Sequence, residues 1–154
     1  MKYQDNSLFP PPESCDEYGI VALSAAVNCE MLIDAYSHGI FPWPFGEGEK
    51  YIPWCSPPER GIIMLDEFHV PHGVKRDLKK WNFSFAVDQN FPAVIKECAR
   101  AVRPGEDGTW ITSQIISSYC QFHKLGYAHS FETYDENGNL AGGLYGISVG
   151  RIFC

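Results

Sequence analysis

The sequence lacks the features that identify several large classes of protein. No run approaches the roughly 18–20 apolar residues of a membrane-spanning helix, and the opening residues M-K-Y-Q-D-N-S lack the apolar core of a secretory signal peptide. We therefore expect a cytoplasmic protein with no membrane partner. There is also no G-x-S-x-G turn, no phosphate-binding P-loop and no dinucleotide-binding fingerprint. The enzyme classes that those motifs define are not indicated.

Closely spaced cysteines are absent too. The six cysteines are Cys15, Cys29, Cys55, Cys98, Cys120 and Cys154, and no two of them form a C-x-x-C pair. This excludes a zinc knuckle or a thioredoxin-type motif and favours reduced thiols, several of them buried. His69 and His72 have the spacing of half a metal site, but no second close pair of ligands accompanies them. We predict no metal site.

An excess of positive charge is likewise missing, since 12 Lys and Arg stand against 19 Asp and Glu. The net charge of −7 argues against broad affinity for nucleic acid. A local exception is Lys75, Arg76, Lys79 and Lys80, which share one face if residues 74–81 form a helix. This face either binds phosphates or is merely solvated, and the residues alone leave both alternatives open.

What is present begins with a proline-rich, aromatic N-terminal region, residues 1–60. One helix is predicted there, with Asn28 as its N-cap and Gly39 just beyond its end. Its apolar stripe consists of Met31, Leu32, Ala35 and Tyr36. The remainder should be irregular and held together by aromatic packing, so we expect a small, loop-rich lobe.

From residue 61 onward the pattern becomes regular. We predict strands at 61–65, 83–87, 129–134 and 140–149, the last two joined by a hairpin at Asn137-Gly138. Helices are predicted at 74–81, from Asn90 to just before Pro104-Gly105 with Val102 facing inward, and from about Thr112 to Gly126. This order of elements indicates an α+β domain with a partly antiparallel sheet.

Two segments could bind a ligand. Residues 37–45 present Phe41, Trp43 and Phe45 on a loop stiffened by prolines, which suits either stacking on a planar ligand or packing the lobe against the main domain. In G-T-W-I-T, the N–H groups after Thr112 could bind a phosphate or a carboxylate, or this segment could be a simple helix cap with Trp110 packed on the core.

The last two predicted strands form a third candidate region. Gly142, Gly143, Gly146 and Gly150 weaken the final strand and suggest a close approach to the backbone. The neighbouring strand carries His129, Ser130 and Glu132. Either His129 and Glu132 serve as general acid or base, or these polar side chains are partnered structural groups, which the residues favour.

Several segments together resemble one family. They are F-P-P-P-E, A-Y-S-H-G-I-F-P-W, W-C-S-P-P-E-R, F-P-A-V-I-K-E-C-A, G-T-W-I-T, L-G-Y-A-H-S-F-E and G-G-L-Y-G-I, in order from Phe9 to Cys154. They are similar to the bacterial leucyl/phenylalanyl-tRNA–protein transferases. The resemblance implies transfer of leucine or phenylalanine from aminoacyl-tRNA to an N-terminal Arg or Lys, which marks the protein for degradation. It also implies no cofactor, no metal and a monomeric full-length enzyme.

The family resemblance extends to fold and site. It implies a small lobe at 1–60 and, at 61–154, the first part of a domain like the GNAT acetyltransferases. Trp43 matches an aromatic residue that contacts the terminal adenosine, and Trp110 and Tyr119 match cleft residues near the aminoacyl end. Leu144 and Phe153 match residues that line the pocket for the leucyl or phenylalanyl side chain. The basic residues Lys75, Arg76, Lys79 and Lys80 match a tRNA-contacting segment.

The sequence departs from the family at three places before its end. G-I-V-A-L-S-A-A-V stands where G-L-L-A-x-G-G-D-L is usual, Cys55 replaces a tryptophan, and His72-Gly73 replaces an Arg-Ser pair. Family members also continue past this sequence with G-E-S-M-F and the residues assigned to the reaction centre. We therefore expect no catalytic residue in this chain and no activity from it alone. Two alternatives are a short non-catalytic paralogue and, more weakly, an unrelated GNAT-type acetyltransferase.

Overall fold

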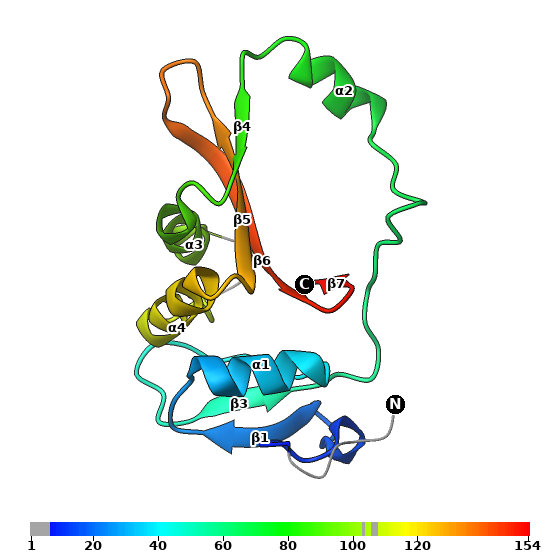
Figure 1. Cartoon of the computed structure of the whole chain (residues 1–154), viewed down its shortest axis with the longest axis vertical. Coiled ribbons are helices and arrows are strands. Elements are labelled where there is room, and N and C mark those ends of the chain that lie inside the picture. Colours follow the sequence, from blue (N-terminus) through cyan, green and yellow to red (C-terminus); the bar gives the residue numbers. More distant parts are fainter. Residues whose placement is uncertain (1–6, 103, 106–107) are drawn as a thin grey trace.

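The computed structural model describes residues 7–102, 104–105 and 108–154, and the fold belongs to the predicted α+β class. Two antiparallel sheets form within these residues, with strand orders β1-β3-β2 and β4-β5-β6-β7 (Figure 1). A short 3-10 helix spans Pro12–Ser14. The helices and strands are β1 (Ile20–Ser24), α1 (Cys29–Ser37), β2 (Phe41–Pro42), β3 (Ile52–Cys55), α2 (His72–Leu78), β4 (Ser84–Val87), α3 (Phe91–Arg100), α4 (Ser113–Lys124), β5 (Ala128–Tyr134), β6 (Leu140–Val149) and β7 (Ile152–Phe153).

The N-terminal lobe contains the predicted helix, α1, and also a sheet that the sequence did not predict. Asn28 caps α1 by accepting a hydrogen bond from the Met31 N–H, and Gly39 follows the helix with a φ of +73°. The expectation that the rest is irregular is wrong, because β3 pairs with both β1 and β2. Pro53 made β3 hard to predict from the sequence, since proline lacks the N–H that a central strand normally donates. Its carbonyl instead accepts from the Trp43 N–H at 2.8 Å.

The second sheet is covered on one face by α3 and α4 (Figure 1). Alternate residues of β5, Ala128, Ser130 and Glu132, are buried. Gly143 of β6 allows a close approach of α3, because a Cβ placed there would lie 3.1 Å from the methyl carbons of Val94. The buried core runs without interruption from the lobe through α4 to this sheet. The core positions in α3 and α4 that the sequence predicted are confirmed at Val94, Ile95, Ile115, Tyr119 and Phe122.

Three predictions for the region after residue 60 need correction. Residues 61–65 form no strand: the apolar side chains there are exposed, and within the described residues no strand lies beside them. A short apolar run becomes a strand only where a partner pairs with its backbone. The helix predicted at 74–81 spans His72–Leu78 instead. Val102 is 95% exposed because α3 ends at Arg100 and the chain is already extended at Ala101.

The remaining elements agree with the sequence. α4 begins after Thr112, whose side chain accepts from the Ile115 N–H, and Gly126 follows the helix with a φ of +82°. The hairpin between β5 and β6 turns at Gly138, which also has a positive φ. No helix in the described ranges is long and apolar enough to cross a bilayer.

Candidate functional site

The aromatic loop meets the start of α4 through two tryptophans. The Trp43 ring lies 6.1 Å from the Trp110 ring and 5.7 Å from the Phe41 ring, measured between centroids. Trp110 packs against the core, whereas Trp43 remains 49% exposed. The loop therefore packs against the segment before α4 and still offers an indole surface to solvent, so packing and stacking, the two alternatives drawn from the sequence, are compatible.

A pocket of about 530 Å³ opens beside this loop. It is lined by Tyr18, Ile20, Phe41, Trp43, Phe45, Cys55 and Pro57. Behind it the Arg60 guanidinium lies 5.5 Å from the centre of the Phe41 ring, donates to the Ser56 hydroxyl at 2.9 Å and contacts the Gly39 carbonyl. The pocket is apolar and aromatic, which suits a planar ring better than a charged group.

The start of α4 is occupied by a carboxylate from the chain itself. Glu47, in the loop between β2 and β3, accepts hydrogen bonds from the Ser113 hydroxyl and from the Ser113 N–H, the latter at 2.9 Å. These two bonds hold the pKa of Glu47 below its usual value. The Ser113 N–H is therefore bonded to a carboxylate of the chain itself, and the segment G-T-W-I-T has the features of the second alternative, since Thr112 caps the helix and Trp110 packs on the core.

Tyr119 lies inside the interface between α1 and α4. It is only 1% exposed, and its hydroxyl lies 2.6 Å from the hydroxyl of Tyr36. Burial raises the pKa of both tyrosines, and the hydrogen bond from Tyr119 offsets part of the increase at Tyr36. The Tyr119 ring also lies 6.0 Å from the Tyr145 ring of β6, so in this structure Tyr119 contacts protein rather than an open cleft.

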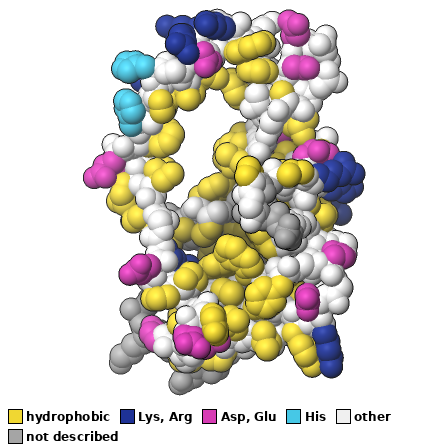
Figure 2. Space-filling view, turned by 180° about the vertical axis from the view of Figure 1, so that it is seen from behind, with side chains coloured by type: hydrophobic (Ala, Val, Ile, Leu, Met, Phe, Trp, Pro, Cys, Tyr) yellow, Lys and Arg dark blue, Asp and Glu magenta, His cyan; other side chains and the backbone are white. Residues whose placement is uncertain are grey.

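Leu144 and Phe153 lie on the open face of the second sheet, the face not covered by helices. Phe131 of β5 joins them, since it pairs with Leu144 across the strands and its ring centre is 5.7 Å from that of Phe153. A pocket of about 470 Å³ on this face is lined by Phe85, Ala86, Val87, Phe131, Glu132, Thr133, Gly142, Gly143 and Leu144. Figure 2 shows hydrophobic side chains around the hollow centre of the molecule. Leu144 and Phe153 remain about half exposed.

The four basic residues lie on and just after α2, far from the aromatic loop. Lys75 and Arg76 are in the helix, Lys79 is its C-cap and Lys80 follows in a turn, and all four are exposed. Figure 2 shows one group of Lys and Arg side chains at the top of the molecule, over α2 in Figure 1, and others elsewhere on the same face. The structure therefore brings Trp43 together with Trp110, and Leu144 together with Phe153, but it keeps the basic residues apart from both pairs.

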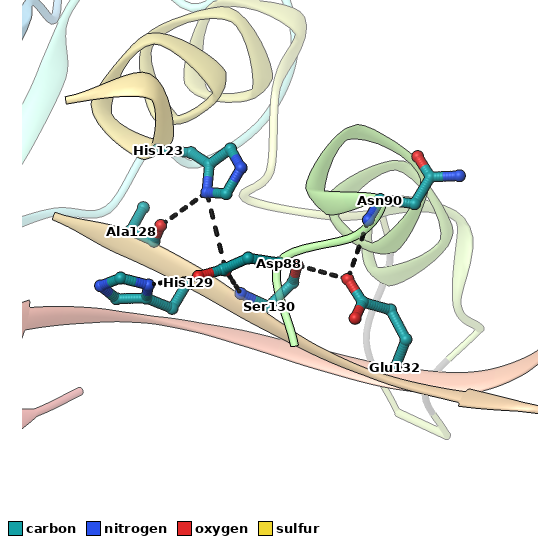
Figure 3. A network of polar contacts seen from close by, with 7 residues as sticks. All are labelled: Asp88, Asn90, His123, Ala128, His129, Ser130 and Glu132. Carbon is teal, nitrogen blue, oxygen red and sulfur yellow. Dashed lines mark hydrogen bonds and ion pairs between the residues drawn. The ribbon is translucent and has the colours of Figure 1, made fainter. Parts of the chain in front are cut away.

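A polar network that the sequence only partly indicated lies where β4 leads into α3 (Figure 3). The Asp88 carboxylate contacts His129 Nδ1 at 2.7 Å and accepts from the Ser130 N–H at 2.9 Å, while His123 Nδ1 lies 3.7 Å away. Burial by itself would raise the pKa of Asp88, but these partners outweigh it and hold the pKa below its usual value. Asp88 has a φ of +59°, the single non-glycine residue in the described ranges with a positive φ.

Glu132 extends the network into the core. It is 1% exposed, and its Oε1 accepts from the Ser130 hydroxyl at 2.6 Å and from the Asn90 N–H at 3.1 Å (Figure 3). Asn90 in turn caps α3. His129 and the Oε1 atom of Glu132 are thus hydrogen-bonded at the turn before α3, the alternative that the sequence favoured, whereas the buried Oε2 atom of Glu132 has no partner among the described residues. Asp88 was not predicted, because one aspartate after a strand forms no recognisable pattern.

No group of three or more His, Cys, Asp or Glu side chains within the described ranges converges as a metal site. The rings of His69 and His72 lie 6.4 Å apart, and none of the six cysteines, all of which are described, forms a disulfide bond. The side chains described above offer aromatic stacking surfaces, an apolar sheet face and a basic surface.

Comparison with known proteins places these features in a family. Residues 62–154 match the family model described as leucyl/phenylalanyl-tRNA protein transferase, and residues 26–58 match the model of its N-terminal domain. A relative named leucyl/phenylalanyl-tRNA–protein transferase from Maridesulfovibrio salexigens is 41% identical over 149 residues, which cover 97% of this chain and 61% of the relative. A relative of the same name from Sulfurimonas denitrificans is 44% identical, over 95% of this chain and 62% of the relative. The chain therefore spans a little over three fifths of their length.

Proposed function

The chain belongs to the leucyl/phenylalanyl-tRNA protein transferase family, and we propose that the protein transfers leucine or phenylalanine from aminoacyl-tRNA to an N-terminal Arg or Lys of a protein. The observation that supports this most directly is the 41% identity to a named transferase across 97% of the chain. The product would carry an N-terminal residue that marks it for degradation. We propose that this takes place in the cytoplasm, where aminoacyl-tRNA is available.

The proposed reaction is the aminolysis of an ester. The α-amine of the acceptor attacks the carbonyl carbon of the aminoacyl ester, the carbon–oxygen bond to the ribose breaks, and the amine loses a proton. Such a reaction depends mainly on positioning and on stabilising the tetrahedral intermediate. We propose that this chain supplies positioning and that the residues of the reaction centre lie outside it.

Each predicted site residue has a proposed part in that positioning. Trp43 would hold the terminal adenosine, because its exposed indole offers a stacking surface, and Trp110 would lie in the cleft near the aminoacyl end. Tyr119 would support the same end of the cleft from the interior. Leu144 and Phe153 would line the pocket for the leucyl or phenylalanyl side chain, and an apolar pocket rejects charged side chains through the cost of desolvation. The exposed Lys75, Arg76, Lys79 and Lys80 would contact tRNA phosphates.

We also propose a division into a lobe at 1–60 and the first part of a GNAT-like domain at 61–154. The gap between the two family models, from residue 58 to residue 62, supports the boundary. The open apolar face of the second sheet supports an incomplete domain, because a sheet normally buries its apolar face against a second layer. In the complete protein, which we propose to be monomeric, further polypeptide would cover this face.

The function is tested with a protein as long as the relatives. The assay measures transfer of labelled phenylalanine from Phe-tRNA to a peptide that begins with Arg. We expect transfer to this peptide and none to the same peptide beginning with Ala. Stacking of a base on an aromatic side chain contributes about 1–3 kcal/mol, so Trp43→Ala should lower transfer about 5- to 150-fold. Trp81→Ala removes an exposed tryptophan after α2 and is the matched control. Transfer that is independent of the peptide's first residue would contradict the proposal.

The 154-residue chain by itself should give transfer at background. The second candidate is a short paralogue that binds aminoacyl-tRNA without catalysis. The paralogue would be supported if the protein, at the length at which it occurs in vivo, binds Phe-tRNA but transfers no phenylalanine. Efficient transfer by the 154-residue chain would contradict both the paralogue and the placement of the reaction centre outside it.

A further inference from the structure

In the loop between β2 and β3, one acidic residue, Glu47, is held by hydrogen bonds to Ser113 at the start of α4. Glu47 lies between Gly46 and Gly48, and neither glycine has an atom within 4 Å of the position a Cβ would occupy. Gly48 also has a φ of +85°. This stretch is therefore exposed and intrinsically free to move. The hydrogen bonds from Ser113 to the Glu47 carboxylate fix it in place.

This contact ties together the two segments that carry the indoles. Glu47 follows Trp43 by four residues, and Ser113 follows Trp110 by three residues. The other end of the loop is held by the hydrogen bond from the Trp43 N–H to the Pro53 carbonyl. With both ends fixed, the Trp43 ring is kept 6.1 Å from the Trp110 ring while half of its surface stays exposed.

We propose that Glu47 and Ser113 are positioning residues that hold Trp43 against Trp110, and thereby shape the surface on which a terminal adenine ring stacks. This inference rests on the proposed function for the identity of the ring, but its structural half does not. Neither residue contacts the ligand in the proposal. They act by setting the position of Trp43.

A carboxylate suits this role because of where it binds. The first N–H groups of a helix have no partner within the helix, and the helix dipole makes this end favourable for negative charge. Ser113 adds a hydroxyl to the same carboxylate. Glu47→Gln keeps the shape but loses the charge, and Ser113→Ala loses the hydroxyl but keeps the N–H. We therefore expect a larger effect from Glu47→Gln than from Ser113→Ala.

Losing the contact should leave the fold intact. The lobe is joined to α4 at two further points along the helix, where the Ser118 hydroxyl donates to the Val27 carbonyl at 2.9 Å and the Tyr119 and Tyr36 hydroxyls meet. Glu49→Gln is the matched control, because it removes the same charge from an exposed position two residues along the same loop. The effects of Glu47→Gln can then be assigned to its contact rather than to net charge.

The first measurement needs no ligand. Nuclear Overhauser effects between the Trp43 and Trp110 indole protons report their proximity in the wild-type chain and in each variant. We expect these signals to fall at least severalfold in Glu47→Gln, to fall less in Ser113→Ala and to persist in Glu49→Gln. The melting temperature of each variant is measured alongside to show that it is folded. Unchanged signals in Glu47→Gln would overturn the inference.

The second measurement is titration with the RNA trinucleotide C-C-A, followed by tryptophan fluorescence. A displaced indole loses stacking, so we expect affinity about three- to tenfold lower for Glu47→Gln and unchanged for Glu49→Gln. Equal affinity in wild type and Glu47→Gln would overturn the inference even if the indoles separate. If wild type binds no C-C-A while Glu47→Gln still loses the indole signals, the proposed adenosine site fails and the positioning of Trp43 by Glu47 stands.

Discussion

Replacing Tyr119 with phenylalanine tests whether its hydroxyl supports the junction between the lobe and α4. The two hydroxyls of Tyr36 and Tyr119 lie 2.6 Å apart, and burial raises the pKa of both. Tyr119→Phe removes one hydroxyl and leaves the other buried without this partner, which costs about 1–3 kcal/mol. For a chain of this size each kcal/mol corresponds to a fall of about 2–4 °C in melting temperature.

The sharper form of this prediction is a double-mutant cycle. Tyr36→Phe should cost about as much as Tyr119→Phe, because each leaves one unsatisfied hydroxyl. The double variant leaves none, so its loss should be close to that of one single variant, and the coupling energy should then equal one single loss, about 1–3 kcal/mol. Urea unfolding measures the free energies, and Tyr18→Phe, at a tyrosine that is 78% exposed, is the control. Additive losses with no coupling would refute the reasoning.

Three further predictions concern the second sheet. Asn90→Ala removes the cap of α3 and should cost about 1 kcal/mol of unfolding free energy in a urea titration. Because the pKa of Asp88 is lowered in the fold, its contribution to stability is complete above the usual aspartate pKa of about 3.9 and is lost as the pH falls through its lowered value. Asp88→Asn should therefore flatten the acid side of a plot of the urea midpoint against pH, and an unchanged slope would count against the network. Gly146→Ala places a methyl group against the Phe153 ring and the Cys154 carbonyl, whereas the control Gly142→Ala places one in open space. The Ile147 N–H donates a hydrogen bond to the Cys154 carbonyl. Hydrogen exchange at this N–H should therefore accelerate in Gly146→Ala and stay unchanged in Gly142→Ala.

Local signals in the sequence predicted the helices well. Asn28, Asn90 and Thr112 are side-chain N-caps in the structure, and Gly39 and Gly126 follow their helices with positive φ. Capping depends on residues within a few positions of one another, so it can be recognised in one sequence. The strand predicted at 61–65 was wrong because an apolar run does not reveal whether a partner strand exists. Strands β2 and β3 were missed because Pro42 and Pro53 argue against strands there, whereas β1 contains no proline and was also missed.

In the candidate site, too, some residues could be identified from the sequence, whereas the contacts between distant segments could not. Family resemblance identified Trp43 and Trp110, and the structure brings their rings together across the junction of the lobe and α4. It could not indicate the contact between Glu47 and Ser113, which are 66 positions apart. Nor could it indicate that Asp88 would join His129. Such contacts depend on how distant segments meet in three dimensions, and no local pattern encodes them.

The continuous core has a consequence for how this family can vary. Although the two family models divide near residue 60, α4 supplies Ser113, Ser118 and Tyr119 to the lobe through hydrogen bonds. A lobe grafted from a relative at that boundary would meet an α4 shaped for a different partner. Functional chimeras should therefore require that the lobe and α4 be exchanged together, and substitutions on the two sides of this junction should be inherited as matched sets.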